Sequence, residues 1–200
     1  YILDAFTTQI GGEAYLKTKG LIGMVAVTGG ELGGTVLTPE QRGPAMIGKL
    51  GVDRQLNRDL RVRVTGSMYK TDKAMSDTLY GGDRAGSRYY WVLENTAASE
   101  TTQAFSGNIN PGFKNKVTAV QVNPFVKFRG LELFGVLERA EGRTAAEAVA
   151  RTFNQYALDP VYRFFEGEKL SVGARYNRVD GNLAGIVNDV GANRWQVGAG

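Results

Sequence analysis

The chain contains neither cysteine nor histidine among its 200 residues. Without cysteine it has no disulfide framework and no thiolate metal site. Without histidine it lacks the commonest general base, the usual base of a nucleophilic triad and a principal zinc ligand. The sequence therefore predicts a protein that is not an enzyme and that uses no metal and no cofactor.

Proline, long apolar runs and blocks of basic residues are also scarce or missing. No stretch approaches the 18 apolar residues of a membrane-spanning helix, although the strands of a membrane β-barrel are short and only half apolar. The net charge of +4 is dispersed, which argues against a nucleic-acid partner. The 27 glycines, 9 tyrosines and 9 phenylalanines suit a chain of many strands and turns.

What the chain does contain is regular alternation of apolar and polar residues. In the segment NRDLRVRVTGSMYKTD, Val62 and Val64 fall on one side of an extended chain, and Arg61 and Arg63 fall on the other. A period of two indicates a β-strand with one apolar and one polar face. Similar patterns occupy residues 44–56, 117–128, 131–139, 154–165 and 169–177, and weaker ones occupy 13–18 and 21–30.

The connections between these segments alternate in length. Short ones at 19–20, 55–59, 129–130 and 166–168 are separated by long polar ones at roughly 30–43, 71–116, 140–151 and 178–192. Short periplasmic turns on one rim and long extracellular loops on the other are typical of outer-membrane barrels. We predict an all-β, antiparallel up-and-down transmembrane β-barrel, with residues 1–200 forming part of one barrel domain of roughly 9–11 strands in this part. Further strands are expected outside these residues, because the alternating run NRWQVGAG stops in mid-strand.

Aromatic residues and two irregular segments complete the pattern. Phe128 and Phe164 would lie near the short-turn rim, and Tyr156, Tyr176 and Trp195 near the other rim, as in the aromatic girdles of membrane barrels. SRYYWVLEN, residues 87–95, has the pattern of a strand inside a long connection, where it either extends outward or folds inward. In GRTAAEAVAR, residues 142–151, a capping-box pattern predicts a short helical turn.

Five segments together resemble the porin-like outer-membrane proteins of Bacteroidota, which are distantly akin to phosphate-selective porins. They are LYGGDRAGSRYYWVLEN, VNPFVKFRGLELFG, RTFNQYALDPVYRF, LSVGARYN and NRWQVGAG, and the resemblance runs from about Ile47 to the end. The resemblance implies a signal peptide, residence in the outer membrane of a Gram-negative cell and passive passage of solutes. It supplies no catalytic residue.

Three functions fit these observations. The first is an outer-membrane porin for passive diffusion of small hydrophilic solutes, with a mild preference for anions left open. The second is a scaffold barrel whose lumen is plugged by the 71–116 connection and whose extracellular loops bind a protein partner. The third is a soluble β-sandwich or adhesin-like domain. The expected partners are outer-membrane lipid and small hydrophilic solutes. A homo-oligomer or a complex with another outer-membrane protein is also compatible with the sequence.

The candidate functional residues are the polar side chains that the alternation places toward the interior of a barrel. Seven are basic and four are acidic. Such charges either form an arginine ladder that attracts anions, for which Arg61 and Arg63 are the best placed, or pair across neighbouring strands. The pore-lining candidates are Lys49, Asp53, Arg61, Arg63, Gln121, Lys127, Glu132, Glu138, Asp159, Arg163, Arg175 and Arg194.

Overall fold

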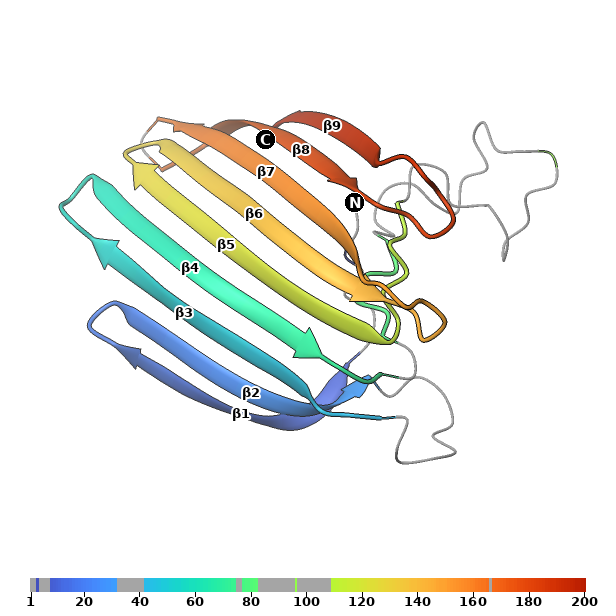
Figure 1. Ribbon diagram of the computed structural model, residues 1–200. Helices are drawn as coiled ribbons and strands as arrows, with labels where there is room; N and C mark the ends of the chain where they lie inside the picture. Colours follow the sequence, from blue (N-terminus) through green and yellow to red (C-terminus); the bar gives the residue numbers. More distant parts are fainter. Residues whose placement is uncertain are drawn as a thin grey trace.

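The computed structural model describes most of the chain as one antiparallel β-sheet. The described residues are 3, 8–31, 42–74, 77–82, 96, 109–165 and 167–200. Each strand pairs with its neighbours in the sequence, from the first to the ninth (Figure 1). The strands are β1 (Gln9–Thr18), β2 (Leu21–Glu31), β3 (Ala45–Gln55), β4 (Leu60–Thr71), β5 (Lys116–Phe128), β6 (Leu131–Arg143), β7 (Arg151–Phe164), β8 (Leu170–Gly181) and β9 (Val190–Ala199).

The predicted all-β, up-and-down antiparallel topology is therefore confirmed. Within the described residues, β1 pairs with β2 alone and β9 with β8 alone, so the nine strands form an open, curved sheet. No helix long and apolar enough to cross a membrane occurs in the described residues.

The predicted alternation of connection lengths is also confirmed. Short connections span residues 19–20, 56–59, 129–130 and 165–169, and long ones span 32–44, 72–115, 144–150 and 182–189. The short connections lie together at the left ends of the strands in Figure 1, and the long ones lie at the right ends. We call these two edges the short-turn rim and the long-connection rim.

The tight turn between β1 and β2 shows how the sequence makes the short-turn rim. Lys19 and Gly20 have φ angles of 44° and 81°. Positive φ at both central residues is the geometry of a type I′ turn, whose twist matches that of the strands it joins. Glycine at the second position adopts this angle without a steric penalty, so the chain reverses in two residues.

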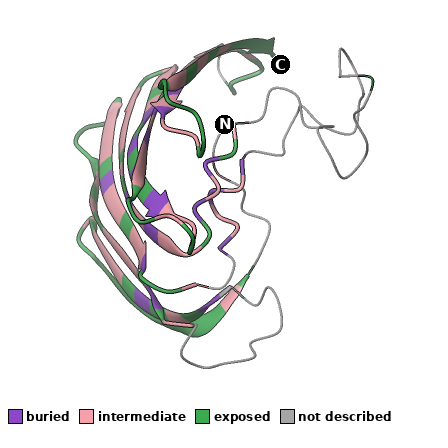
Figure 2. Ribbon diagram, turned by 45° about the vertical axis from the view of Figure 1, so that its right-hand side comes forward, coloured by how far each residue is buried: buried purple, intermediate pink, exposed green. Residues whose placement is uncertain are grey.

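Strand register divides the side chains between two faces of the sheet. Lys49, Ser67, Gln121, Glu138 and Gln155 are successive direct cross-strand partners and therefore share one face. This face also carries the packed connection residues and is the concave side of the curved sheet in Figure 2. We call it the concave face and the opposite one the convex face.

The convex face is apolar and open to its surroundings. Leu50 is 74% exposed, Leu137 is 50% exposed and Val197 is 82% exposed. Val64 and Val122 belong to the same face and are 46% and 37% exposed. A water-soluble domain normally exposes single, scattered apolar side chains, whereas here exposed apolar side chains extend across a whole face of the sheet.

The best-packed part of the molecule lies on the concave face near the long-connection rim. Tyr80 and Phe113, both from the connection between β4 and β5, are buried against Val117, Ala140 and Phe153 of the sheet. The ring of Phe113 lies 5.7 Å from that of Tyr80 and 6.1 Å from that of Phe153. Apolar contacts therefore fix this connection onto the sheet.

One detail of the sequence expectation differs in the structure, and another is not tested by it. The segment after β6 contains a turn and no helix. The backbone N–H of Thr144 donates to Oε2 of Glu147, which is one of the two hydrogen bonds of a capping box, but the N–H of Glu147 donates to the carbonyl of Thr144 and not to its hydroxyl. Arg151 already pairs with Gly142 as β7 begins. The strand-like segment 87–95 lies outside the described residues.

Pro160 interrupts the pairing between β7 and β8, because proline has no N–H to donate. The register of the two strands is the same on both sides of this interruption.

Candidate functional site

All twelve predicted pore-lining residues lie on the concave face. Lys49 and Asp53 stand on β3, and the remaining residues follow on β4 to β9 at positions of the same parity. Alternation alone was enough to find them, because a strand places every second side chain on the same side. The structure adds the contacts between them.

The first contact joins β3 and β4. Nε of Arg61 donates to Oδ1 of Asp53 at 2.8 Å, and its NH2 group donates to Oδ2 at 2.6 Å. This two-pronged geometry is the strongest form of an arginine–carboxylate pair. Of the two alternatives given by the sequence, an arginine ladder or charge pairing across strands, Arg61 therefore follows the second.

Arg63 differs from Arg61. Its guanidinium carbon lies 5.0 Å from the centre of the Phe125 ring, a cation–π contact with the strand beside it. Within the described part of the chain Arg63 has no carboxylate partner, although Asp53 is directly across the strand pair. The predicted two-arginine ladder thus reduces to one arginine whose charge is not neutralised by an ion pair.

A second group of charges bridges β5, β6 and β7 near the short-turn rim. Nζ of Lys127 lies 3.0 Å from Glu132 and 3.1 Å from Glu168. Nε of Arg163 lies 3.4 Å from each of the same two carboxylates. Two cations and two anions alternate in this network, so their charges cancel locally and the strands are joined.

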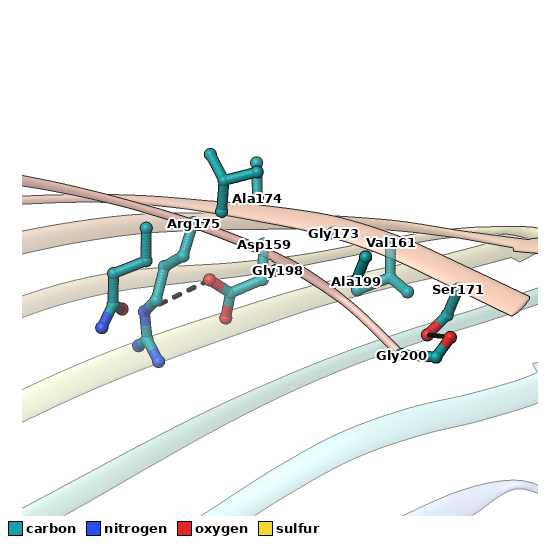
Figure 3. A pocket seen from close by; sticks show the side chains of 11 residues that line it. Asp159, Val161, Ser171, Gly173, Ala174, Arg175, Gly198, Ala199 and Gly200 are labelled. Atoms are coloured by element: carbon teal, nitrogen blue, oxygen red, sulfur yellow. Dashed lines mark hydrogen bonds and ion pairs between the residues drawn. The ribbon is translucent and has the colours of Figure 1, made fainter.

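A third pair lies toward the β9 edge of the sheet, beside an open hollow. Nε of Arg175 on β8 is 3.2 Å from Oδ1 of Asp159 on β7. Figure 3 shows these two side chains facing each other, while Ser171 and Gly200 meet at the other end of the hollow. The hydroxyl of Ser171 donates to the carbonyl of Gly200 at 3.3 Å. The pairing of concave-face charges across strands is therefore repeated here.

The connection between β4 and β5, which the sequence analysis offered as a plug, is attached to the sheet by contacts that the sequence did not specify. Its described residues 77–82 and 109–115, which we call the inner segment, lie against the concave face. The hydroxyl of Tyr80 donates to Oε1 of Glu138 at 2.5 Å, and the hydroxyl of Tyr69 donates to Oδ2 of Asp77 at 2.7 Å. The backbone N–H of Gly112 donates to the carbonyl of Tyr80 at 3.0 Å.

Burial determines the chemistry of Tyr80. Its side chain is fully enclosed, and burial, followed by the charge of Glu138, raises the pKa of its hydroxyl far above the ordinary value. The hydroxyl therefore keeps its proton and acts as a hydrogen-bond donor. Glu138, predicted to face a wet interior, is instead covered by the inner segment and also accepts a hydrogen bond from Gln155 at 3.3 Å.

Glycine at position 142 makes room for this arrangement. A Cβ atom added to Gly142 would overlap the side chain of Phe113. Neither this close approach nor the burial of Tyr80 has a local sequence signature. The only available signal was the aromatic character of the two residues within a polar connection.

A pH-sensitive contact stabilises the connection between β6 and β7. Nε of Arg151 is 2.6 Å from Oε1 of Glu147, and the backbone N–H of Thr144 donates to Oε2 at 2.8 Å. The guanidinium, followed by the Thr144 hydrogen bonds, lowers the pKa of Glu147 from 4.5 to about 2. The charged form of Glu147 is therefore the form that the folded chain favours.

A folded-state pKa below the unfolded-state value stabilises the folded chain above pH 4.5, and this contribution is lost as the pH falls through about 2. We expect Glu147→Gln to lower the midpoint of thermal unfolding at neutral pH. The difference from the native chain should shrink as the pH falls below 4.5. A difference that stays constant over this range would contradict the assignment.

No protein-family model matches the chain, and searches of curated proteins and of solved structures found no match either. The family resemblance based on sequence motifs therefore stays a prediction.

Proposed function

We propose that the chain forms part of the wall of an outer-membrane barrel that allows passive diffusion of small hydrophilic solutes. The observation that carries the proposal is the separation of the two faces. The convex face exposes apolar side chains from β1 to β9 and has its charges near the two rims, while the twelve predicted pore-lining residues share the concave face. A sheet with one apolar and one charged face suits a boundary between lipid and a water-filled interior.

The lengths of the strands support this reading. They contain 10 to 14 residues, and a tilted strand needs about 9–11 residues to cross a bilayer. The regular division into short turns and long connections suits the periplasmic and extracellular rims. In this proposal the unpaired edges of β1 and β9 are met by further strands, because an unpaired backbone edge has no hydrogen-bond partner in lipid.

Swelling of proteoliposomes tests this function. Vesicles containing the full-length protein should swell in solutions of small sugars and swell less as the sugars become larger. Vesicles that stay unswollen with every sugar, although the protein is inserted, would contradict passive diffusion.

The inner segment favours a second candidate, a barrel with a closed lumen that serves as a scaffold for a partner protein. Tyr80, Phe113 and Asp77 fix this segment on the concave face, where it occupies space that a solute would cross. This candidate predicts that the protein inserts into a membrane and conducts no ions.

The charges on β3 and β4 give a testable prediction of ion preference. Arg63 has no carboxylate partner among the described residues, so Arg63→Gln should shift the permeability ratio toward cations. Asp53→Asn should shift it toward anions, because it leaves Arg61 without its partner. Each shift should be roughly twofold, as expected for one charge about 7 Å from the path of an ion in water. Reversal potentials in a salt gradient measure both, and shifts of the same sign would contradict the prediction.

A further inference from the structure

Three exposed basic residues stand at the β1–β4 end of the short-turn rim, and we call them the basic rim cluster: Lys19, Arg54 and Arg58. Lys19 lies in the β1–β2 turn, Arg54 near the end of β3 and Arg58 in the β3–β4 turn, and all three are exposed. The β1–β2 turn and β3 are in contact, because the N–H of Asp53 donates to the carbonyl of Gly20 at 2.7 Å. The side chain of Arg54 also runs directly beside Gly20.

The described acidic residues nearest the cluster are engaged by other basic residues. Asp53, beside Arg54 in the sequence, is held by Arg61 at 2.6 Å. Asp59 lies 3.4 Å from Nε of Arg129, in the next turn along the rim. Glu168 is engaged on the concave side by Lys127 and Arg163. In the described part of the chain, the three residues of the basic rim cluster have no carboxylate partner.

The convex face has a different charge pattern at the long-connection rim. There Arg139 lies 2.8 Å from Glu141, and Arg178 lies 3.4 Å from Asp180. Each arginine has an acidic neighbour two residues away on the same face of its strand. The outward charges are therefore paired at one rim, while the basic rim cluster at the other is not.

Apolar residues border the basic rim cluster on the membrane side. Leu21 and Val52 are direct cross-strand partners on the convex face and are 49% and 43% exposed, and Leu56 in the adjoining turn is 60% exposed. Long basic side chains above an apolar band reach the level of lipid headgroups, where they meet phosphate groups.

We propose that the basic rim cluster binds the headgroups of anionic phospholipids in the leaflet that surrounds the short-turn rim. The inference rests on the proposed function, in which the convex face lies in lipid. It adds a lipid preference and assigns that preference to one rim. The guanidinium groups of Arg54 and Arg58 offer paired N–H donors to a phosphodiester, and Lys19 adds a third positive charge.

Residues 1–200 contain no cysteine, so a cysteine-free form of the full-length protein needs no replacement here and allows a direct test with single labels. A fluorophore is attached at Leu56→Cys in the full-length protein, which is inserted into phosphatidylcholine vesicles. Quenching is then compared between a minority of nitroxide-labelled phosphatidylglycerol and the same amount of nitroxide-labelled phosphatidylcholine. We expect the anionic lipid to quench about two- to fivefold more strongly, and high salt to remove the difference.

Two further measurements assign the effect to the cluster. In the triple variant Lys19→Gln, Arg54→Gln, Arg58→Gln, the two labelled lipids should quench the fluorophore equally. In the double variant Arg139→Gln, Arg178→Gln, the anionic lipid should quench it more strongly, as in the native chain. A label at Met46→Cys, at the opposite end of β3 and 53% exposed at Met46, should show no lipid preference.

Each outcome has a distinct meaning. If the two labelled lipids quench the fluorophore equally in the protein with the native cluster, this inference is overturned, although the protein is still shown to be inserted in the membrane. A preference that persists in the triple variant would overturn the assignment to these residues. No quenching by either lipid would contradict the proposed function itself, because the convex face would then not lie in a bilayer.

Discussion

Val64→Arg is expected to impair folding into a lipid bilayer by ~2–4 kcal/mol if the residue lies near the midplane. Val64 is exposed on the convex face and has Val52 and Pro124 as direct cross-strand partners. In the proposed barrel, a guanidinium at this position would put an unpaired charge in hydrocarbon, where the valine would contact lipid. Urea titration of the protein folded in vesicles measures the change.

The matched control is Ser67→Arg, on the same strand but on the concave face. Its direct partners are Lys49 and Gln121, so the new charge would lie among polar residues. We expect this variant to fold with little loss of stability. If both arginine variants destabilise equally, or if only Ser67→Arg does, the assignment of the two faces is wrong.

Phe113→Ala is expected to release the inner segment from the concave face. Phe113 is completely buried and contacts the rings of Tyr80 and Phe153, and truncation of such a residue removes about 3–5 kcal/mol of packing. The amide of Gly112, which bonds to the carbonyl of Tyr80, should exchange hydrogen faster. If the segment narrows the passage, conductance should rise together with exchange.

Tyr80→Phe provides an independent variant, since it keeps the ring and removes only the hydrogen bond to Glu138. It should cause a smaller change of the same sign, because a lost buried hydrogen bond costs about 1–3 kcal/mol. Val187→Ala is the control and should change neither property, because Val187, in the β8–β9 connection, is 97% exposed. Faster exchange without higher conductance would show that the inner segment does not restrict the passage.

The alternation of apolar and polar residues was sufficient to predict the faces of the strands. Lys49 on β3 and Arg175 on β8 are far apart in the sequence, yet alternation places both on one face of the sheet, and the strand register agrees. Period-two patterns are reliable here because one face of the sheet is polar and the other apolar. A strand that is buried on both faces would be apolar on both and would show no alternation.

Contacts that depend on distant residues could not be predicted in the same way. Tyr80 and Glu138 are 58 positions apart in the chain, and nothing near either residue indicates that they meet. The ion pair between Asp53 and Arg61 joins neighbouring strands, but alternation does not distinguish Arg61 from Arg63 as the partner. The register places Asp53 opposite Arg63, while the longer diagonal reach of Arg61 makes the bond.

Single-channel conductance tests the central claim most directly. The full-length protein is purified in detergent and added to a planar bilayer, with a salt gradient to record the reversal potential. An open water-filled barrel predicts discrete conductance steps, with a reversal potential that Arg63→Gln and Asp53→Asn move in opposite directions. A native protein that inserts, as shown by lipid quenching, and produces no conductance steps would contradict the porin and favour the closed scaffold barrel.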